Sequence, residues 1–211
     1  IGGRSLLHRY LESLVSVGIR RAEIVVGYKQ EMIRAAVEQD CCGVNVTFLV
    51  NEQFHRGSIS SLWIARTALD DDTIVMDADV LFHPDILRRL VASPCENALL
   101  MDETVQQTGE ECMVVVAGGR VIALTKNMPE RYDYAGEGVG FLRVRHADTP
   151  HVVSSLRGYI ERGSWDMEYE DALRAYFQDV RVGYERIGGL PWSEVDFIED
   201  GRKAELGGLA K

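Results

Sequence analysis

A short apolar run that ends in two aspartates constrains this chain more than any other stretch. Residues 73–82 read Thr-Ile-Val-Met-Asp-Ala-Asp-Val-Leu-Phe, and the apolar part is typical of a short buried strand. Asp77 and Asp79 follow at its C-terminal end, where open α/β sheets bind their ligands. Two carboxylates on a rigid strand end suit Mg²⁺, which takes one or two protein carboxylates and completes its shell with water and substrate phosphates. The plainer alternative is that both acids only cap the turn and the helix after Pro84.

Helical and strand patterns alternate on both sides of this run. An apolar stripe predicts a helix over residues 6–17, with Ser5 as its N-cap and Gly18 as its stop signal. Strands are expected over 23–28, 44–50, 97–101, 141–144 and 180–186, and further helices over 29–39, 84–91, 150–160 and 169–177. The alternation predicts one α/β domain over residues 1–211, with a mostly parallel central sheet flanked by helices.

The middle of the chain departs from this alternation. Gly118-Gly119 stands between two apolar runs, residues 112–117 and 120–125, which predicts an inserted β-hairpin with Lys126 at its end. The segment Gly136-Glu137-Gly138-Val139-Gly140 follows, and its glycines allow the backbone to approach a ligand closely. Without a strand before it and a helix after it, this segment is no dinucleotide-binding fingerprint.

A run of small polar residues, Gly57-Ser58-Ile59-Ser60-Ser61, stands just before a helix expected from Leu62. Its hydroxyls and backbone N–H groups could face an anion or a base edge. A simple helix N-cap would use the same residues, and the sequence alone leaves both readings open.

Composition excludes several classes of function. The formal net charge of −10 argues against a nucleic-acid partner, because phosphate backbones are bound by basic patches. No apolar run approaches the ~18 residues of a membrane span, and no signal-peptide pattern opens the sequence, so we expect a cytoplasmic protein without membrane insertion. The four cysteines show no Cys-x-x-Cys pattern and no histidine at ligand spacing, which argues against zinc and for reduced thiols.

Four motifs occur in the order found in sugar-phosphate nucleotidyltransferases. They are Asp77-Ala78-Asp79, Gly136 to Phe141, Tyr169-Glu170-Asp171-Ala172-Leu173, and Gly188-Gly189-Leu190-Pro191-Trp192-Ser193-Glu194-Val195-Asp196. Over almost its whole length the chain resembles the phosphocholine cytidylyltransferase-like branch, which also contains enzymes acting on inositol 1-phosphate and on phosphonates. The resemblance implies a Rossmann-like enzyme that joins CTP, or another nucleoside triphosphate, to a small phospho-alcohol or phosphonate and releases pyrophosphate.

The resemblance also implies roles for residues of this chain. Asp79 and Asp196 would hold Mg²⁺, which offsets repulsion between the attacking phosphate and the nucleotide and neutralises the leaving pyrophosphate. Lys126 would meet the acceptor phosphate, although a solvated hairpin lysine is the plain alternative. Nucleotide contacts are expected from Ser60, Ser61 and Asp77, and acceptor contacts from Glu137, Tyr169 and Glu170. Homodimer formation stays open.

The acceptor is harder to predict. Tyr132, Tyr134, Trp165 and Tyr169 could surround a quaternary ammonium group, or they could serve in packing. Members of the family normally begin with a strand and a Gly-x-Gly-x-Arg loop that ends in Pro-Lys, whereas this sequence starts after such a loop. If the polypeptide lacks that loop, we expect little or no transferase activity.

Three other readings of the Asp-x-Asp motif compete. A metal-dependent glycosyltransferase would use a nucleotide sugar, but it would lack the Trp-x-Glu-x-Asp acid near the C-terminus. A phosphatase with an aspartyl nucleophile wants Thr or Val where Leu81 stands. A non-catalytic nucleotide-binding fragment is the third reading.

Overall fold

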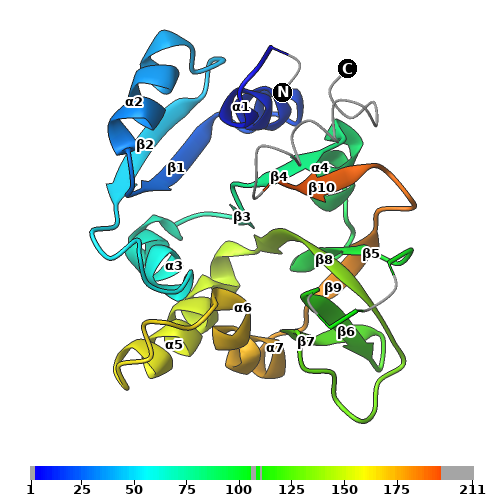
Figure 1. Cartoon of the computed structure of the whole chain (residues 1–211). Helices are drawn as coiled ribbons and strands as arrows, with labels where there is room; N and C mark the ends of the chain where they lie inside the picture. Colours follow the sequence, from blue (N-terminus) through cyan, green and yellow to red (C-terminus); the bar gives the residue numbers. More distant parts are fainter. Residues whose placement is uncertain (1–2, 106–107, 110, 196–211) are drawn as a thin grey trace.

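The computed structural model describes residues 3–105, 108–109 and 111–195. Figure 1 shows the helices and strands along the chain. They are α1 (Leu6–Ser16), β1 (Arg21–Val26), α2 (Gln30–Gln39), β2 (Asn45–Val50), α3 (Ile59–Ala65), the 3₁₀ turn η1 (Arg66–Ala68), β3 (Thr73–Met76), β4 (Val80–Phe82), α4 (Pro84–Val91), β5 (Ala98–Asp102), β6 (Met113–Ala117), β7 (Arg120–Thr125), β8 (Tyr134–Val144), the 3₁₀ turn η2 (His146–Asp148), α5 (Thr149–Ile160), α6 (Tyr169–Ala172), α7 (Arg174–Asp179), β9 (Gly183–Arg186) and β10 (Trp192–Glu194). No described helix is long and apolar enough to cross a membrane.

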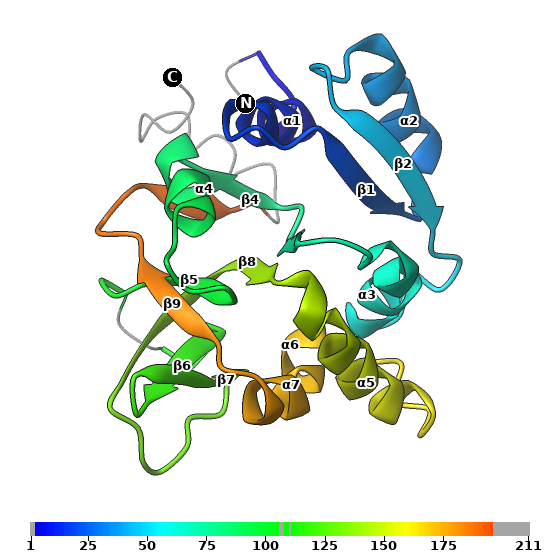
Figure 2. The same cartoon turned by 180° about the vertical axis from the view of Figure 1, so that it is seen from behind.

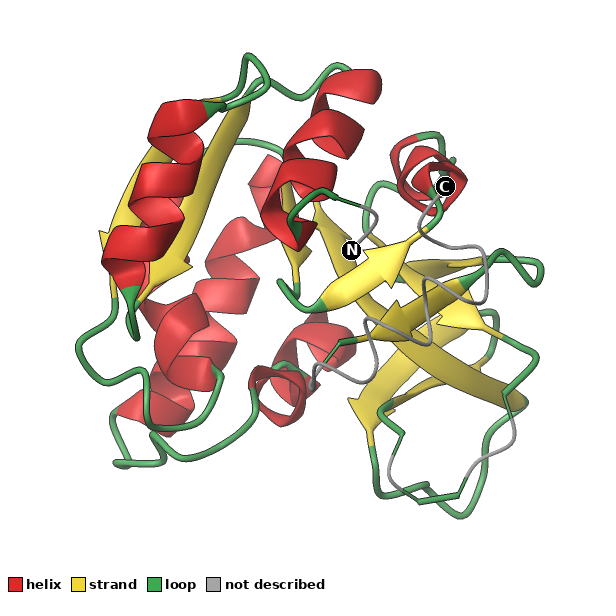
Figure 3. Cartoon of the chain, turned by 45° about the horizontal axis from the view of Figure 1, so that its top comes forward, coloured by secondary structure: helices red, strands yellow, loops and turns green. Residues whose placement is uncertain are grey.

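The first layer of the fold forms as its sequence predicts. The Ser5 hydroxyl accepts a hydrogen bond from the His8 N–H and so caps α1, and Gly18 follows the helix with a φ of +86°. Strands β1 and β2 pair in parallel around α2. Figure 3 shows α2 lying along this two-stranded layer, apart from the larger group of strands.

The larger sheet is mixed. Its strand order is β7-β6-β8-β5-β9, and β3 pairs with β8 outside that path. Strand β9 runs parallel to β5, whereas β8 runs antiparallel to β3, β5 and β6. The expected α/β class, with a central sheet flanked by helices, is confirmed. The hairpin is confirmed as well, because β6 and β7 pair across Gly118 and Gly119, whose φ angles of +59° and +70° suit a tight hairpin turn.

Two apolar cores hold the helices to the strands. One gathers side chains of α3, α5, α6 and α7 against β5, β6, β7 and β8, and Figure 2 shows these four helices grouped on one side of the molecule. The other core joins α1 and α4 with β4, β5 and β8. Burial of these apolar side chains supplies the main favourable free energy of folding.

Four local expectations need correction. The expected strand before Asp77 is confirmed as β3, but the chain does not pass directly from the acids to a helix: Asp77-Ala78-Asp79 forms a turn and the short strand β4 follows it. The glycine segment 136–140 lies inside the long strand β8 and not ahead of a strand that starts at Phe141. The helix expected over 169–177 is divided at Leu173 into α6 and α7. Ser60 and Ser61 lie within α3, because that helix begins at Ile59.

Candidate functional site

The turn between β3 and β4 carries Asp77 and is fixed through its backbone. The Asp77 N–H donates to the Gly140 carbonyl oxygen at 2.9 Å. The Tyr10 hydroxyl, from α1, donates to the Asp77 carbonyl oxygen at 2.6 Å and accepts from the Val80 N–H at 3.1 Å. Two elements far from the turn in sequence, α1 and β8, therefore hold it in one position, as a preorganised metal or phosphate site requires.

The C-terminal part of the described chain reaches the same turn. Strand β10 pairs antiparallel with β4, so that Glu194 stands opposite Val80. One residue later the Val195 N–H donates to the Asp79 carbonyl oxygen at 2.8 Å. Asp196, the predicted partner of Asp79, lies outside the described residues, so its metal role stays a prediction.

The Asp77 carboxyl group lies in an unfavourable place for a negative charge. Burial is the largest effect and, together with the charge of Glu170, it raises the pKa of Asp77 to about 7. Asp79 and Glu194 add to the rise, whereas a 3.2 Å hydrogen bond from the Tyr169 hydroxyl opposes it. The structure thus brings the predicted nucleotide residue Asp77 together with the predicted acceptor residues Tyr169 and Glu170.

Glu170, like Asp77, lies where a negative charge is unfavourable. Burial raises its pKa to about 7, with further contributions from Glu168 and Asp171. The Lys126 ammonium opposes this rise, so the predicted catalytic lysine lies near Glu170 at the end of β7. Lys126 is exposed, as a lysine that meets a phosphate from solution must be.

A cavity of about 590 Å³ opens on the side of Glu194, which also acts on the charge of Asp77. It is lined by Asp102, Thr104, Val105, Glu137, Gly189, Leu190, Pro191, Trp192, Ser193 and Glu194. Burial, followed by the charge of Glu194, raises the pKa of Glu137 to about 7. Hydrogen bonds from Thr104 and from the Trp192 indole lower the pKa of Asp102 even though burial acts in the opposite direction. The cavity therefore keeps an ionised carboxylate on its wall.

These carboxyl groups fit a hard divalent cation. Their donors are all oxygen atoms, which Mg²⁺ prefers. Asp77, Glu137 and Glu170 each lie among like charges, and a cation would relieve that repulsion. The acidic residues near Asp77 are thus chemically suited to the expected magnesium ion, although no three described carboxylates here lie within 4.8 Å of one another.

Replacing Glu170 by glutamine should stabilise the metal-free chain at alkaline pH. The pKa of Glu170 lies at about 7 in the folded chain against 4.5 ordinarily, so its favourable contribution is complete below about pH 4.5 and is lost as the pH rises through about 7. One of its carboxylate oxygens is buried without a hydrogen-bond partner among the described residues. We expect Glu170→Gln to gain about 1–3 kcal/mol in free energy of unfolding at pH 8. Urea unfolding at pH 4 and pH 8 measures this gain, and an equal gain at both pH values would contradict the assignment.

The serines of the run 57–61 make hydrogen bonds within the fold. Ser60 is 1% exposed, and the hydroxyls of Ser60 and Ser61 accept hydrogen bonds from the Asn51 side-chain amide at 2.9 and 3.1 Å. Ser58 makes no side-chain cap of α3, and its hydroxyl accepts from the Tyr169 N–H. Nucleotide binding by Ser60 and Ser61 stays a prediction.

The aromatic residues considered for an ammonium cage lie in different surroundings. Tyr134 packs edge-on against Tyr184 under the Arg186 guanidinium, and Trp165 faces the Arg56 guanidinium. Tyr169 is buried against Asp77. These contacts favour the packing alternative for the three residues.

Sequence reasoning missed three residues of this site. Tyr10 lies in the apolar stripe expected over residues 6–17, and no local pattern reveals that its hydroxyl bridges a turn 67 residues away. Glu194 belongs to the Trp-x-Glu-x-Asp motif, so its position two residues before Asp196 was a usable signal. Asp102 ends a buried strand much as Asp77 does, and that pattern could have identified it.

Comparison with known families identifies the chain. Residues 1–135 match the model of the MobA-like NTP transferase domain. The chain belongs to this family. The acidic turn, the β6–β7 hairpin and the start of β8 all lie within the matched region of this NTP transferase domain.

Two curated relatives are similar to this NTP transferase domain over nearly its whole length. A CMP-5'-(3-aminopropyl)phosphonate synthase of Streptomyces rubellomurinus is 27% identical over 98% of the chain. A bifunctional IPC transferase and DIPP synthase of Rubrobacter xylanophilus is 29% identical over 97% of the chain. The chain spans 34% and 45% of the lengths of these two relatives. The resemblance to cytidylyltransferases inferred from the motifs is confirmed.

Two solved structures share the fold. The inositol-1-phosphate CTP transferase of T. maritima superposes with a TM-score of 0.75 at 19% identity, covering 100% of this chain and 85% of that one. The CTP:phosphocholine cytidylyltransferase of Streptococcus pneumoniae superposes with a TM-score of 0.71 at 20% identity, covering 98% and 86%. At these identities the likeness concerns the fold.

Proposed function

We propose that this NTP transferase domain joins CTP to a small molecule bearing a phosphate or phosphonate and releases pyrophosphate, with Mg²⁺ as its metal ion. The observation that carries the proposal is the convergence of the Asp77-Ala78-Asp79 turn, Glu170 of α6 and Glu194 of β10 on one site. The curated relatives include a protein named for a CMP-phosphonate product, which supports this reaction type.

The side chains have distinct roles in this proposal. Asp79 and Asp196 would hold Mg²⁺, which would neutralise phosphate charge and align the reacting groups. Lys126 would meet the negative phosphate or phosphonate of the acceptor as a mobile point charge. Asp77, held by Gly140 and Tyr10, would orient the nucleotide or the water around the ion.

The cavity favours an acceptor that carries a positive group. Its wall holds Asp102, Glu137 and Glu194 beside the Trp192 ring. Carboxylates and an aromatic face attract an ammonium group, whereas a neutral polyol gains nothing from their charge. We therefore propose an amino or ammonium acceptor, such as phosphocholine or an aminoalkylphosphonate, ahead of inositol phosphate.

Pyrophosphate release tests the proposal. CTP and Mg²⁺ are supplied with phosphocholine, 3-aminopropylphosphonate or inositol 1-phosphate, and the assay is run on this chain and on the chain preceded by the family's strand and phosphate loop. We expect acceptor-dependent pyrophosphate release, with the two cationic acceptors turned over faster than inositol 1-phosphate. Turnover of a nucleotide sugar without pyrophosphate would support the glycosyltransferase reading instead. Absence of pyrophosphate with every acceptor, in both forms, would overturn the proposal.

A further inference from the structure

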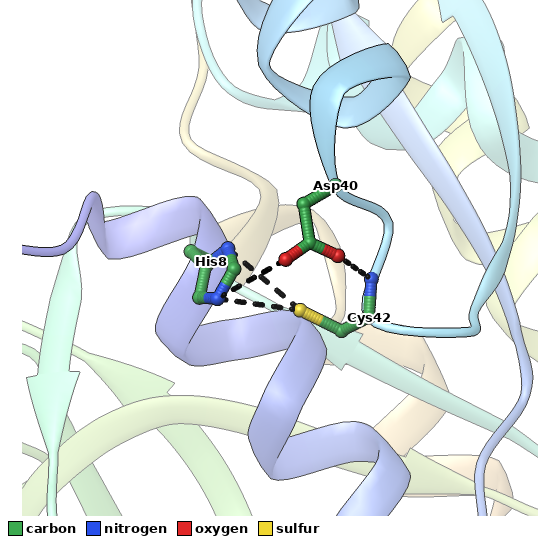
Figure 4. Close-up of side chains that lie close together, drawn as sticks. All are labelled: His8, Asp40 and Cys42. Atoms are coloured by element: carbon green, nitrogen blue, oxygen red, sulfur yellow. Dashed lines mark hydrogen bonds and ion pairs between the residues drawn. The ribbon is translucent and has the colours of Figure 1, made fainter.

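A second group of metal-binding side chains lies on the first layer of the fold. His8 comes from α1, and Asp40 and Cys42 come from the turn between α2 and β2. Figure 4 shows the three side chains pointing toward one another. One ligand atom from each lies within 4.8 Å of the other two. Among the described residues, this is the group of three metal-ligating side chains that meets this distance.

Two of the three ligand separations are close to the edges of a tetrahedral zinc site. Tetrahedral bonds of about 2.0–2.3 Å to nitrogen, oxygen and sulfur place neighbouring ligand atoms about 3.3–3.6 Å apart. The His8 Nε2 atom lies 3.6 Å from the Cys42 Sγ atom and 3.8 Å from the Asp40 Oδ2 atom. The Asp40 and Cys42 ligand atoms lie within 4.8 Å of each other, so rotations of these side chains that shorten the separations would bring all three atoms onto one ion.

The group is unsuited to nucleophilic catalysis by the thiol. A Cys-His-Asp triad places the acid and the thiol on opposite ring nitrogens, whereas here the Cys42 Sγ atom lies about equally far from both, 3.7 Å from Nδ1 and 3.6 Å from Nε2. Burial, then the charges of Asp40 and Glu12, raises the pKa of the Cys42 thiol, which disfavours a free thiolate. A divalent cation reverses that balance, because it binds the thiolate directly and offsets the nearby carboxylates.

The cation would find the ligands partly oriented. The Asp40 Oδ1 atom accepts the Cys42 N–H at 2.8 Å, which leaves the Oδ2 atom turned toward His8. The Glu12 Oε1 atom lies 3.6 Å from the His8 Nε2 atom and adds negative charge beside the group.

We propose that His8, Asp40 and Cys42 form a zinc site, with water as the fourth ligand, that fastens α1 to the turn between α2 and β2. A thiolate and an imidazole select zinc over magnesium, so the site is chemically distinct from the all-oxygen group around Asp79. The separation of 34 positions between His8 and Cys42 explains why ligand spacing in the sequence argues against zinc.

Cobalt substitution tests the site without any assay of turnover. The chain is treated with EDTA, the chelator is removed, and Co²⁺ is titrated in while thiolate-to-cobalt charge-transfer absorption is recorded. We expect one equivalent of Co²⁺ to produce this absorption and Zn²⁺ to displace it. Cys42→Ser should abolish the absorption, and His8→Ala should weaken binding by more than the ~10–100-fold that loss of an outer-shell partner costs.

Matched variants separate this site from other thiols and from the acidic site. Cys41→Ser removes the adjacent thiol, which is not a member of the group, and it should keep the absorption. Asp79→Ala should keep it too. Circular dichroism of the metal-free variants verifies that each is folded. No absorption in the folded parent chain, its persistence in Cys42→Ser, or its loss in Cys41→Ser would each overturn the proposal.

Discussion

Replacing Asp79 by alanine is expected to reduce Mg²⁺-dependent pyrophosphate release by about 10³-fold or more. A metal ion that bridges reacting phosphates supplies several kcal/mol of transition-state stabilisation, and about 4 kcal/mol corresponds to that factor. Asp79 is exposed at the acidic turn, so the loss of its carboxylate should change the free energy of unfolding little. Initial rates at several Mg²⁺ concentrations, together with the melting temperature, measure both effects.

A matched control distinguishes this specific loss from a general loss of negative charge. Asp71 is also exposed and lies in the loop just before β3. Asp71→Ala therefore removes an equal charge from a nearby position in the chain. The Asp71→Ala variant should keep Mg²⁺-dependent pyrophosphate release near the parent level. Asp196→Ala should behave like Asp79→Ala, since both are proposed to hold one ion. Retained activity in either variant would remove that residue from the metal site.

The features predicted best were those that depend on neighbours in sequence. The Ser5 cap, the Gly118-Gly119 hairpin and the acids at the end of β3 are each specified by a few adjacent residues. Each involves short-range hydrogen bonding or backbone conformation that the chain fixes locally.

Features that depend on distant partners could not be read in this way. The turn at Asp77 is held by Tyr10 and Gly140, which bind its backbone from other elements. Strand β8 starts at Tyr134 because β5 and β6 pair with its glycine-rich half and supply hydrogen bonds that no local pattern encodes. Likewise, His8 reaches Cys42 only after α1 packs beside the α2–β2 turn. Strand register and tertiary contacts decide these features, and neither can be read from the hydrophobic periodicity of a short stretch of sequence.

The contact between Gly140 and Asp77 carries the second large expectation, in Gly140→Ala. Gly140 has a φ of +77°, a conformation that costs other residues about 1–2 kcal/mol. An added Cβ atom would also lie well inside van der Waals contact with Asp77, including 3.0 Å from its carboxyl carbon. Since the Gly140 carbonyl oxygen also accepts the Asp77 N–H, the backbone cannot withdraw without losing that bond. We expect a loss of about 2–4 kcal/mol in free energy of unfolding and a fall in turnover of about 10²-fold.

Gly119→Ala isolates the part of this effect that comes from backbone strain alone. Gly119 has a similar φ of +70°, but an added Cβ atom there meets nothing within 4 Å. That variant should lose only about 1 kcal/mol and keep its turnover, because the added Cβ atom displaces no neighbour. Denaturant unfolding and CTP turnover of the two variants, measured side by side, give the difference due to the collision. Equal losses of stability and turnover in the two variants would show that Asp77 tolerates a Cβ atom at position 140. The tight packing argued for the acidic turn would then be wrong.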